Sequence, residues 1–217
     1  MEGLEKIKKE IEKKDKKMKC GDFEWEVNYF SKDGKVDINL FSDVAEGLVT
    51  KCIDFGENNE NAVDEDYERN KNGEFKCQGL KGEKNGKKFY YGKNEYKKDC
   101  PKENRKKIKN ISLNQMRKFY DEILSYQNQI ENAGDDNNQL EKFRELLPYI
   151  KMQKAKVNLA YQKKNININF KRFIDLNIDY IVDGYGNNLE KCLEKFNIFV
   201  SLFEAVIAYS KGVIKEN

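Results

Sequence analysis

The chain has 217 residues, of which 38 % are apolar and 36 % are charged, and its formal net charge is +3. This is more polar than an average globular domain, so a compact core can occupy only part of the chain. Histidine is absent, which removes the commonest general base and the metal and nucleophile sites built on imidazole. There is no apolar run long enough for a signal peptide or a membrane span, so we expect a cytoplasmic protein without a membrane partner.

The charge is unevenly distributed along the chain. An acidic run lies between positions 54 and 68, and the stretch from Lys71 to Lys109 then carries fourteen Lys and Arg against five Asp and Glu. A second basic stretch, Lys142 to Arg172, has nine Lys and Arg against Glu145 alone. The distribution therefore says more about a partner than the small net charge does.

The five cysteines are odd in number and widely spaced. Structural zinc sites usually pair their ligands two to four residues apart, and no such pair occurs among Cys20, Cys52, Cys77 and Cys100. We therefore expect reduced thiols and no metal, with Cys192 in the core of the last helix.

The N-terminal part shows two short patterns. Residues 1–19 are mostly charged, with Leu4, Ile7 and Ile11 at helical spacing, which predicts a short lysine-rich helix. Residues 22–36 alternate apolar and polar side chains and then reach Asp33-Gly34, which favours a short strand ending in a turn. We assign residues 1–35 to a charged N-terminal extension.

Apolar residues then recur at helical spacing in five segments, at about 37–53, 112–133, 140–161, 170–181 and 189–210. The pattern predicts an all-α fold, a small helical bundle of about five helices. The bundle domain spans 36–217 and is interrupted after its first helix by a lysine-rich insertion at about 54–110. Within that insertion Asn85-Gly86 favours a tight hairpin turn, with a disordered loop as the alternative.

Three residues predict where the helices begin, bend and end. Ser112, followed by Gln115 three residues later, is typical of a helix start in which two side chains satisfy free backbone N–H groups. Pro148 should kink or split the third helix. Gly184 suits the left-handed residue that closes the fourth.

The insertion interleaves aromatic residues with lysines, from Phe75-Lys76 to Tyr96-Lys97-Lys98. This mixture can stack on bases and neutralise phosphates, but the pattern favours a solvated lysine-rich loop over a specific nucleic-acid contact. The carboxylates are dense only in Asn- and Gly-rich sequence that holds no fixed geometry. We therefore predict no catalytic residues.

The stretch from Ile111 to Tyr120 combines a helix start with dense positive charge. Met116 and Tyr120 should face the core, while Gln115 and Lys118 lie on one flank and Arg117 on the other. Four basic residues precede it between positions 105 and 109. Because backbone N–H groups at a helix start also favour anions, a phosphate backbone is the natural partner.

This stretch resembles a helix opening in the small subunit of the Csm effector complex of type III-A CRISPR systems, with Ser112, Gln115 and Met116-Arg117-Lys118 matching. Leu146-Leu147-Pro148 followed by Leu159-Ala160-Tyr161 is similar to a second pattern of that family, although Lys163-Lys164 stands where the family has Gly-Arg. Phe203 to Tyr209 with Lys211 is similar to the family's closing segment. The three places lie within residues 111–213.

The resemblance implies a non-catalytic subunit that binds the crRNA guide and target RNA through phosphates, beside other Csm subunits and further copies of itself. No cofactor is implied. Charge and position single out eight candidate RNA contacts: Lys107, Lys109, Gln115, Arg117, Lys118, Lys154, Lys163 and Lys164. A helical protein–protein interaction module without RNA contact is the main alternative, and a nuclease is a second.

Overall fold

The computed structural model describes residues 16–20, 23–53, 75–76, 81–84, 87–90, 96–97 and 111–214. The chain divides into two compact units. The first combines Met1–Asn61 with Asn110–Asn217, and the second is Ala62–Lys109.

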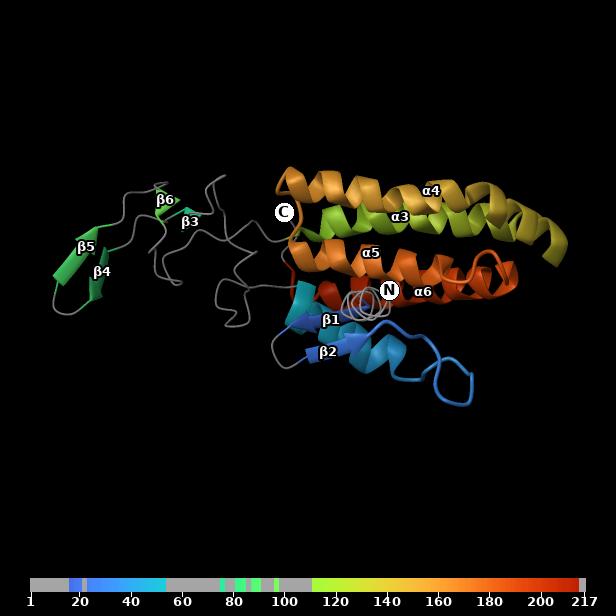
Figure 1. Ribbon diagram of the computed structural model, residues 1–217, viewed down its shortest axis with the longest axis horizontal. Coiled ribbons are helices and arrows are strands. Elements are labelled where there is room, and N and C mark those ends of the chain that lie inside the picture. The colour runs from blue at the N-terminus through green and yellow to red at the C-terminus, as the bar shows by residue number, and fades with distance from the viewer. Residues whose placement is uncertain are drawn as a thin grey trace, which may run out of the picture. The chain divides into compact units, whose positions relative to one another are not determined.

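Four long helices form the body of the first unit and lie side by side (Figure 1). They are α3 (Leu113–Glu131), α4 (Asp136–Gln162), α5 (Ile168–Val182) and α6 (Leu189–Ser210). Helix α4 packs against α3 and α5, and α6 packs against α3. Aromatic rings fill the space between them, with Phe203 against Tyr120, Phe170 and Phe173 at centroid distances of 5.4 to 6.0 Å.

Each long helix begins with a side chain that accepts a hydrogen bond from the backbone N–H three residues later. The four capping residues are Ser112, Asp135, Asn167 and Asn188. The start predicted at Ser112 is confirmed, since its hydroxyl accepts from Gln115 N at 3.3 Å. The left-handed residue predicted at Gly184 is also confirmed, with φ of +87°.

Helix α4 is not split at Pro148. Proline removes one backbone donor and its ring crowds the preceding turn. The helix nevertheless spans 27 residues, because Leu146, Leu147 and Ile150 around the proline are buried against the rest of the bundle.

The first core helix is predicted correctly, but its hydrogen bonds differ from those of a regular α-helix. It runs through η1 (Leu40–Val44), α2 (Ala45–Gly47) and η2 (Leu48–Ile53), and the two η segments are wider π-helical turns. The wider turn shifts which residues face inward: Leu40, Leu48 and Val49 are buried, but Phe41, which a regular α-helix would place on the same side as Leu48, is 37 % exposed. With this helix the described residues form a five-helix bundle, as predicted.

A two-stranded antiparallel sheet also belongs to the first unit. Strands β1 (Lys17–Cys20) and β2 (Phe23–Glu26) pair so that Met18 faces Trp25, and both side chains are buried. Residues 17–19 are therefore in a strand, and the helix predicted for 1–19 is wrong there; residues 1–15 lie outside the described residues. Buried Met18 and Cys20 alternate with exposed lysines, and this period of two residues is typical of a strand.

Cys20 and Cys52 form a disulfide, which corrects the expectation of reduced thiols at these positions. The bond joins β1 to the end of η2, and both residues belong to the buried core. The two cysteines are 32 residues apart in sequence, so their spacing gave no signal. Cys192 is a free buried thiol, as predicted.

The described residues of the second unit form four short strands in two pairs. Strand β4 (Lys81–Lys84) pairs with β5 (Lys87–Tyr90) around the predicted hairpin turn, and Lys84 faces Lys87. Strand β3 (Phe75–Lys76) pairs with β6 (Tyr96–Lys97). The hairpin prediction is confirmed.

Candidate nucleic-acid interface

The bundle brings four helix ends together at one end of the first unit. Helices α3 and α5 begin there, and α4 and α6 end there (Figure 1). Phe119 in the second turn of α3 contacts Phe170 in the first turn of α5, with ring centroids 5.6 Å apart. The start of α3 is therefore beside the start of α5, and the end of α4 lies at the same end of the bundle.

Three predicted site residues lie in the first two turns of α3. Lys118 is exposed, whereas Gln115 and Arg117 are half-buried beside the core residues Met116 and Phe119. This order follows from the helical period, which places 116 and 119 inward and 118 outward. Lys118 is thus the member of this group best placed for a phosphate in solvent.

Lys163 and Lys164 follow the last residue of α4 at the same end of the bundle. Lys163 caps α4, with its backbone N–H donating to Leu159 O at 3.0 Å, and both lysines are exposed. Lys164 has φ of +58°, the left-handed conformation that turns the chain toward Asn167 and α5. A pair of cations at a helix C-terminus also offsets the negative end of the helix dipole.

Lys154 lies away from the rest of the group. It precedes Lys163 by nine residues, which corresponds to about 14 Å along a helix. Its Nζ is 2.5 Å from Asp179 Oδ1 on α5, so its charge is engaged within the bundle. The structure therefore does not gather Lys154 with the other predicted site residues.

Lys107 and Lys109 lie outside the described residues. Two basic residues that we did not single out lie at the same end of the bundle: Arg172 is exposed in the first turns of α5, and Lys211 caps α6. Arg172 is the last residue of the basic stretch from Lys142 to Arg172, and that stretch was the sequence signal that could have identified it as a site residue. Recognising it required knowing that α5 begins beside the end of α4.

A polar network lies deeper between α3 and α4. Tyr126 Oη donates to Glu122 Oε1 at 2.7 Å, Gln153 Nε2 donates to Tyr126 Oη at 3.3 Å, and Lys156 pairs with Glu122. Burial raises the pKa of Tyr126 to about 12, and the hydrogen bond to Glu122 adds to the shift. For Glu122, burial acts to raise the pKa, but hydrogen bonds from Lys156 and Tyr126 outweigh it and lower the value. The network connects α3 to α4, and within it the carboxylate of Glu122 is paired with the ammonium group of Lys156.

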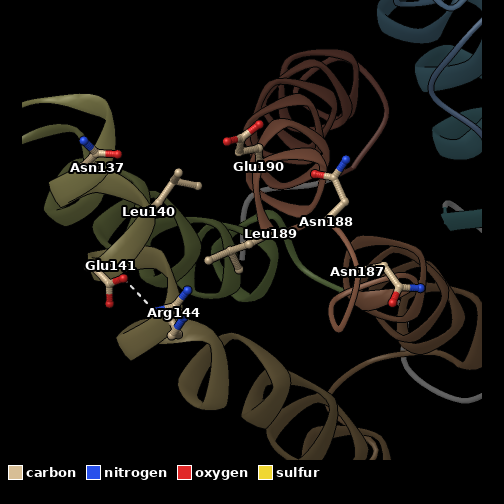
Figure 2. Close-up of a pocket in the computed structure, with 8 residues that line it drawn as sticks. All are labelled: Asn137, Leu140, Glu141, Arg144, Asn187, Asn188, Leu189 and Glu190. Atoms are coloured by element: carbon tan, nitrogen blue, oxygen red, sulfur yellow. Dashed lines mark hydrogen bonds and ion pairs between the residues drawn. The ribbon is translucent and has the colours of Figure 1, made fainter.

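A groove of about 600 Å³ lies at the other end of the bundle, where α4 and α6 begin (Figure 2). Its lining residues are Asn137, Leu140, Glu141, Arg144, Asn187, Asn188, Leu189 and Glu190. Its two carboxylates come from different helices, and Arg144 Nη1 holds Glu141 at 2.6 Å. The groove does not present two carboxylates aimed at one point, as acid–base chemistry would require.

The described residues were also compared with the requirements of a metal site and of a membrane span. Among them, no three His, Cys, Asp or Glu side chains cluster as metal ligands would. None of the described helices is both long and apolar enough to cross a membrane.

The family model for Csm2 of type III-A systems matches residues 95–215, more than half of the chain, and includes all four long helices. No curated protein and no solved structure matches. The matched region covers the three places of resemblance in the sequence and both helix ends that carry the exposed lysines. The chain therefore belongs to the Csm2 family, the small subunit of type III-A CRISPR effector complexes.

Proposed function

We propose that this small subunit binds the duplex of crRNA and target RNA through its phosphates and catalyses no reaction itself. The observation that carries the proposal is the presence of exposed basic residues from two helices at the end of the bundle where α3 begins and α4 ends. Lys118, Lys163 and Lys164 are exposed there, with Arg117 beside them. Cations on one surface without a base-reading element are typical of sequence-independent binding to a phosphate backbone.

Binding by this surface would release counterions from RNA and fix the position of the subunit along the duplex. Gln115 can add a hydrogen bond to a phosphate or ribose, and Lys107 and Lys109 remain candidates from the sequence. Lys154 is the weakest candidate because a phosphate would have to displace Asp179. The proposal includes further Csm subunits and further copies of this chain as partners in the cytoplasm.

The test is RNA binding across a salt series, with single-stranded and duplex RNA of unrelated sequences. The variant carries Lys118→Glu and Lys164→Asn. Asparagine is chosen because it tolerates the left-handed conformation at position 164. Loss of two phosphate contacts should reduce affinity and lower the log–log salt slope by about 1.4 on single strands.

The matched control carries Lys32→Glu and Lys35→Gln, which change the net charge equally. Both lysines are exposed in the turn after β2, in an element separate from α3 and α4. The control should bind RNA like the unmodified chain. Equal losses of RNA affinity in both variants would show that net charge alone explains the change. Absence of RNA binding at low salt would favour the protein–protein interaction module.

A further inference from the structure

The Cys20–Cys52 disulfide lies between elements that pack against one helix. It joins β1 to the last turn of η2, and both of these elements contact α5. The side chains of Cys20 and Cys52 are 2 % and 0 % exposed. A change at this bond therefore acts on packed neighbours, and α5 contacts both elements that the bond joins.

Two asparagines connect the end of η2 to the start of α5. Asn169 Nδ2 donates to Cys52 O at 2.9 Å, and Asn167 Nδ2 donates to Ile53 O at 2.8 Å. Asn167 Oδ1 also accepts from Phe170 N at 2.9 Å, so the same side chain caps α5. The position of the last turn of η2 is therefore linked directly to the cap of α5.

The cap of α5 also ends the loop that carries Lys163 and Lys164. Lys164 has φ of +58°, a conformation that a non-glycine residue keeps only when the surrounding structure holds it. On one side the loop is held by the bond from Lys163 N–H to Leu159 O at 3.0 Å. On the other side it is held by fully buried Ile166 and by Asn167. The connection to η2 thus helps to position two exposed lysines.

The hairpin of β1 and β2 has a second anchor on α5. Tyr29, which follows β2, is fully buried, and its Oη donates to Asn177 Oδ1 at 2.5 Å. This anchor remains when the disulfide is reduced, whereas the last turn of η2 loses its covalent bond to β1. Reduction should therefore loosen the end of η2 and the α5 cap before it loosens the rest of the bundle.

We propose that the Cys20–Cys52 bond is a redox switch for the position of Lys163 and Lys164, which are held when it is oxidised and loosened when it is reduced. The reductant is a dithiol. Its thiolate attacks one sulfur of the bond to form a mixed disulfide, and the other cysteine leaves as a thiolate that takes a proton. The second thiol of the reductant then displaces the first cysteine, so the protein gains two electrons and two protons and the reductant becomes a disulfide. Because both cysteines are buried, the attack follows a local opening.

The consequence for RNA rests on the proposed function. Thiol reductants keep most cysteines reduced in the cytoplasm, and a disulfide that forms there is usually catalytic or redox-sensing. Lysines that are already held in place lose less conformational freedom when they contact phosphates. The oxidised chain should therefore bind duplex RNA about three- to tenfold more tightly than the reduced chain.

Hydrogen exchange of the full chain, with and without dithiothreitol, tests the switch in the absence of RNA. The readout is the exchange rate of Phe170 N–H at the α5 cap divided by that of Ile123 N–H, which belongs to a buried residue in the middle of α3. Reduction should raise this ratio about tenfold, because the cap opens locally while a buried amide in mid-helix exchanges mainly through global unfolding. Equal acceleration at both amides would show a general loss of stability and would overturn the switch.

Three variants locate the response. Cys20→Ser with Cys52→Ser should show the raised ratio without reductant and no response to dithiothreitol. Cys77→Ser with Cys100→Ser is the matched control and should respond like the unmodified chain. Asn169→Ala removes the donor to Cys52 O, so reduction should then change the ratio by less than about threefold. A full response in Asn169→Ala would contradict the route through the start of α5.

The affinity of the oxidised and reduced chains for one RNA duplex, at one salt concentration, completes the test. Equal affinities with an unchanged exchange ratio would overturn the switch and leave the proposed function intact. Equal affinities with a raised ratio would overturn the regulation of RNA binding. If the oxidised chain binds no RNA, the proposed function fails, and the exchange ratio still decides the switch. Helical circular dichroism of each form excludes unfolding.

Discussion

Asn167, the N-cap of α5, is tied to Ile53, the last residue of the first core helix: its Nδ2 donates to Ile53 O at 2.8 Å. The Oδ1 of the same side chain accepts from Phe170 N at 2.9 Å and so caps α5. The neighbouring Asn169 donates to Cys52 O at 2.9 Å. Two buried asparagines at the start of α5 therefore donate hydrogen bonds to the last two backbone carbonyl groups of the first core helix. The insertion follows that helix in the chain.

Asn167→Ala should destabilise the protein by roughly 2–4 kcal/mol. The substitution removes a helix cap, worth about 1 kcal/mol, and leaves a buried carbonyl without its donor, at about 1–3 kcal/mol. Urea unfolding followed by circular dichroism measures the change. Asn188→Ala is the control, because Asn188 caps α6 from an exposed position and its loss should cost only about 1 kcal/mol. Equal losses would show that the bond to Ile53 contributes nothing.

Gly47 is predicted to be intolerant of any side chain. A Cβ at this position would lie 2.2 Å from Cε2 of Phe23, which packs over the first core helix from strand β2. Gly47→Ala should therefore cost about 1–3 kcal/mol, the usual range for overpacking. Thermal unfolding of Gly47→Ala, alone and combined with Phe23→Ala, measures the clash.

The double variant is informative because removal of the ring removes the clash. Adding Gly47→Ala to Phe23→Ala should cost less than adding it to the unmodified chain. Gly186→Ala, with open space around its Cβ, should change stability by less than about 0.5 kcal/mol. Additive losses in the double variant would place the cost in the helix backbone around position 47 and not in contact with Phe23.

The long helices could be predicted from the sequence because each buries one face at a regular spacing. Ser112 marked a helix start for the same local reason, since a cap acts within four residues. For the site, charge alone identified Lys118, Lys163 and Lys164 as candidates, and the fold adds that all three lie at the same end of the bundle. Lys154 has the same charge, but its partner Asp179 lies 25 residues away and no local pattern indicates the pair.

What sequence reasoning missed depends on long-range contacts. The strand at Lys17–Cys20 is held by pairing with β2, where Trp25 covers Met18, and by the bond from Cys20 to Cys52, which lies 32 residues away in sequence. The π-helical turns of η1 and η2 likewise changed which residues face inward, so Phe41 is exposed. A helical period read from sequence assumes a regular α-helix and cannot foresee that shift.

The Cys20–Cys52 disulfide should contribute measurably to stability. A bond that closes a loop of this length restricts the unfolded chain by about 3–4 kcal/mol in the chain-entropy account. Reduction, or the double change Cys20→Ser with Cys52→Ser, should lower the free energy of unfolding by roughly 2–4 kcal/mol. Unfolding with and without dithiothreitol tests this, and mass spectrometry after alkylation counts the thiols. The double variant should no longer respond to dithiothreitol; a response equal to that of the unmodified chain would place the sensitivity elsewhere.

Alkaline pH should weaken the fold through Tyr126. Its pKa is raised to about 12, first by burial and then by its hydrogen bond to Glu122. An unfolded tyrosine titrates near about 10, so between about pH 10 and 12 the unfolded chain releases a proton that the folded chain keeps. The stabilisation is therefore fully present below about pH 10 and is lost as the pH rises toward about 12.

Urea unfolding at about pH 8, 10 and 11 measures this dependence, since the window lies between the unfolded and folded pKa values. Tyr126→Phe should be less stable than the unmodified chain at the lowest pH, because Gln153 loses a hydrogen-bond partner, but its stability should fall less between the two higher values. Tyr29 is fully buried and its pKa is also raised by burial, so part of the fall should remain in this variant. Tyr185→Phe, on the exposed turn between α5 and α6, should keep the full pH dependence of the unmodified chain. If Tyr126→Phe and the unmodified chain lose stability in parallel over this range, the proton on Tyr126 does not couple to folding and the α3–α4 network is held by Lys156 and Glu122 alone.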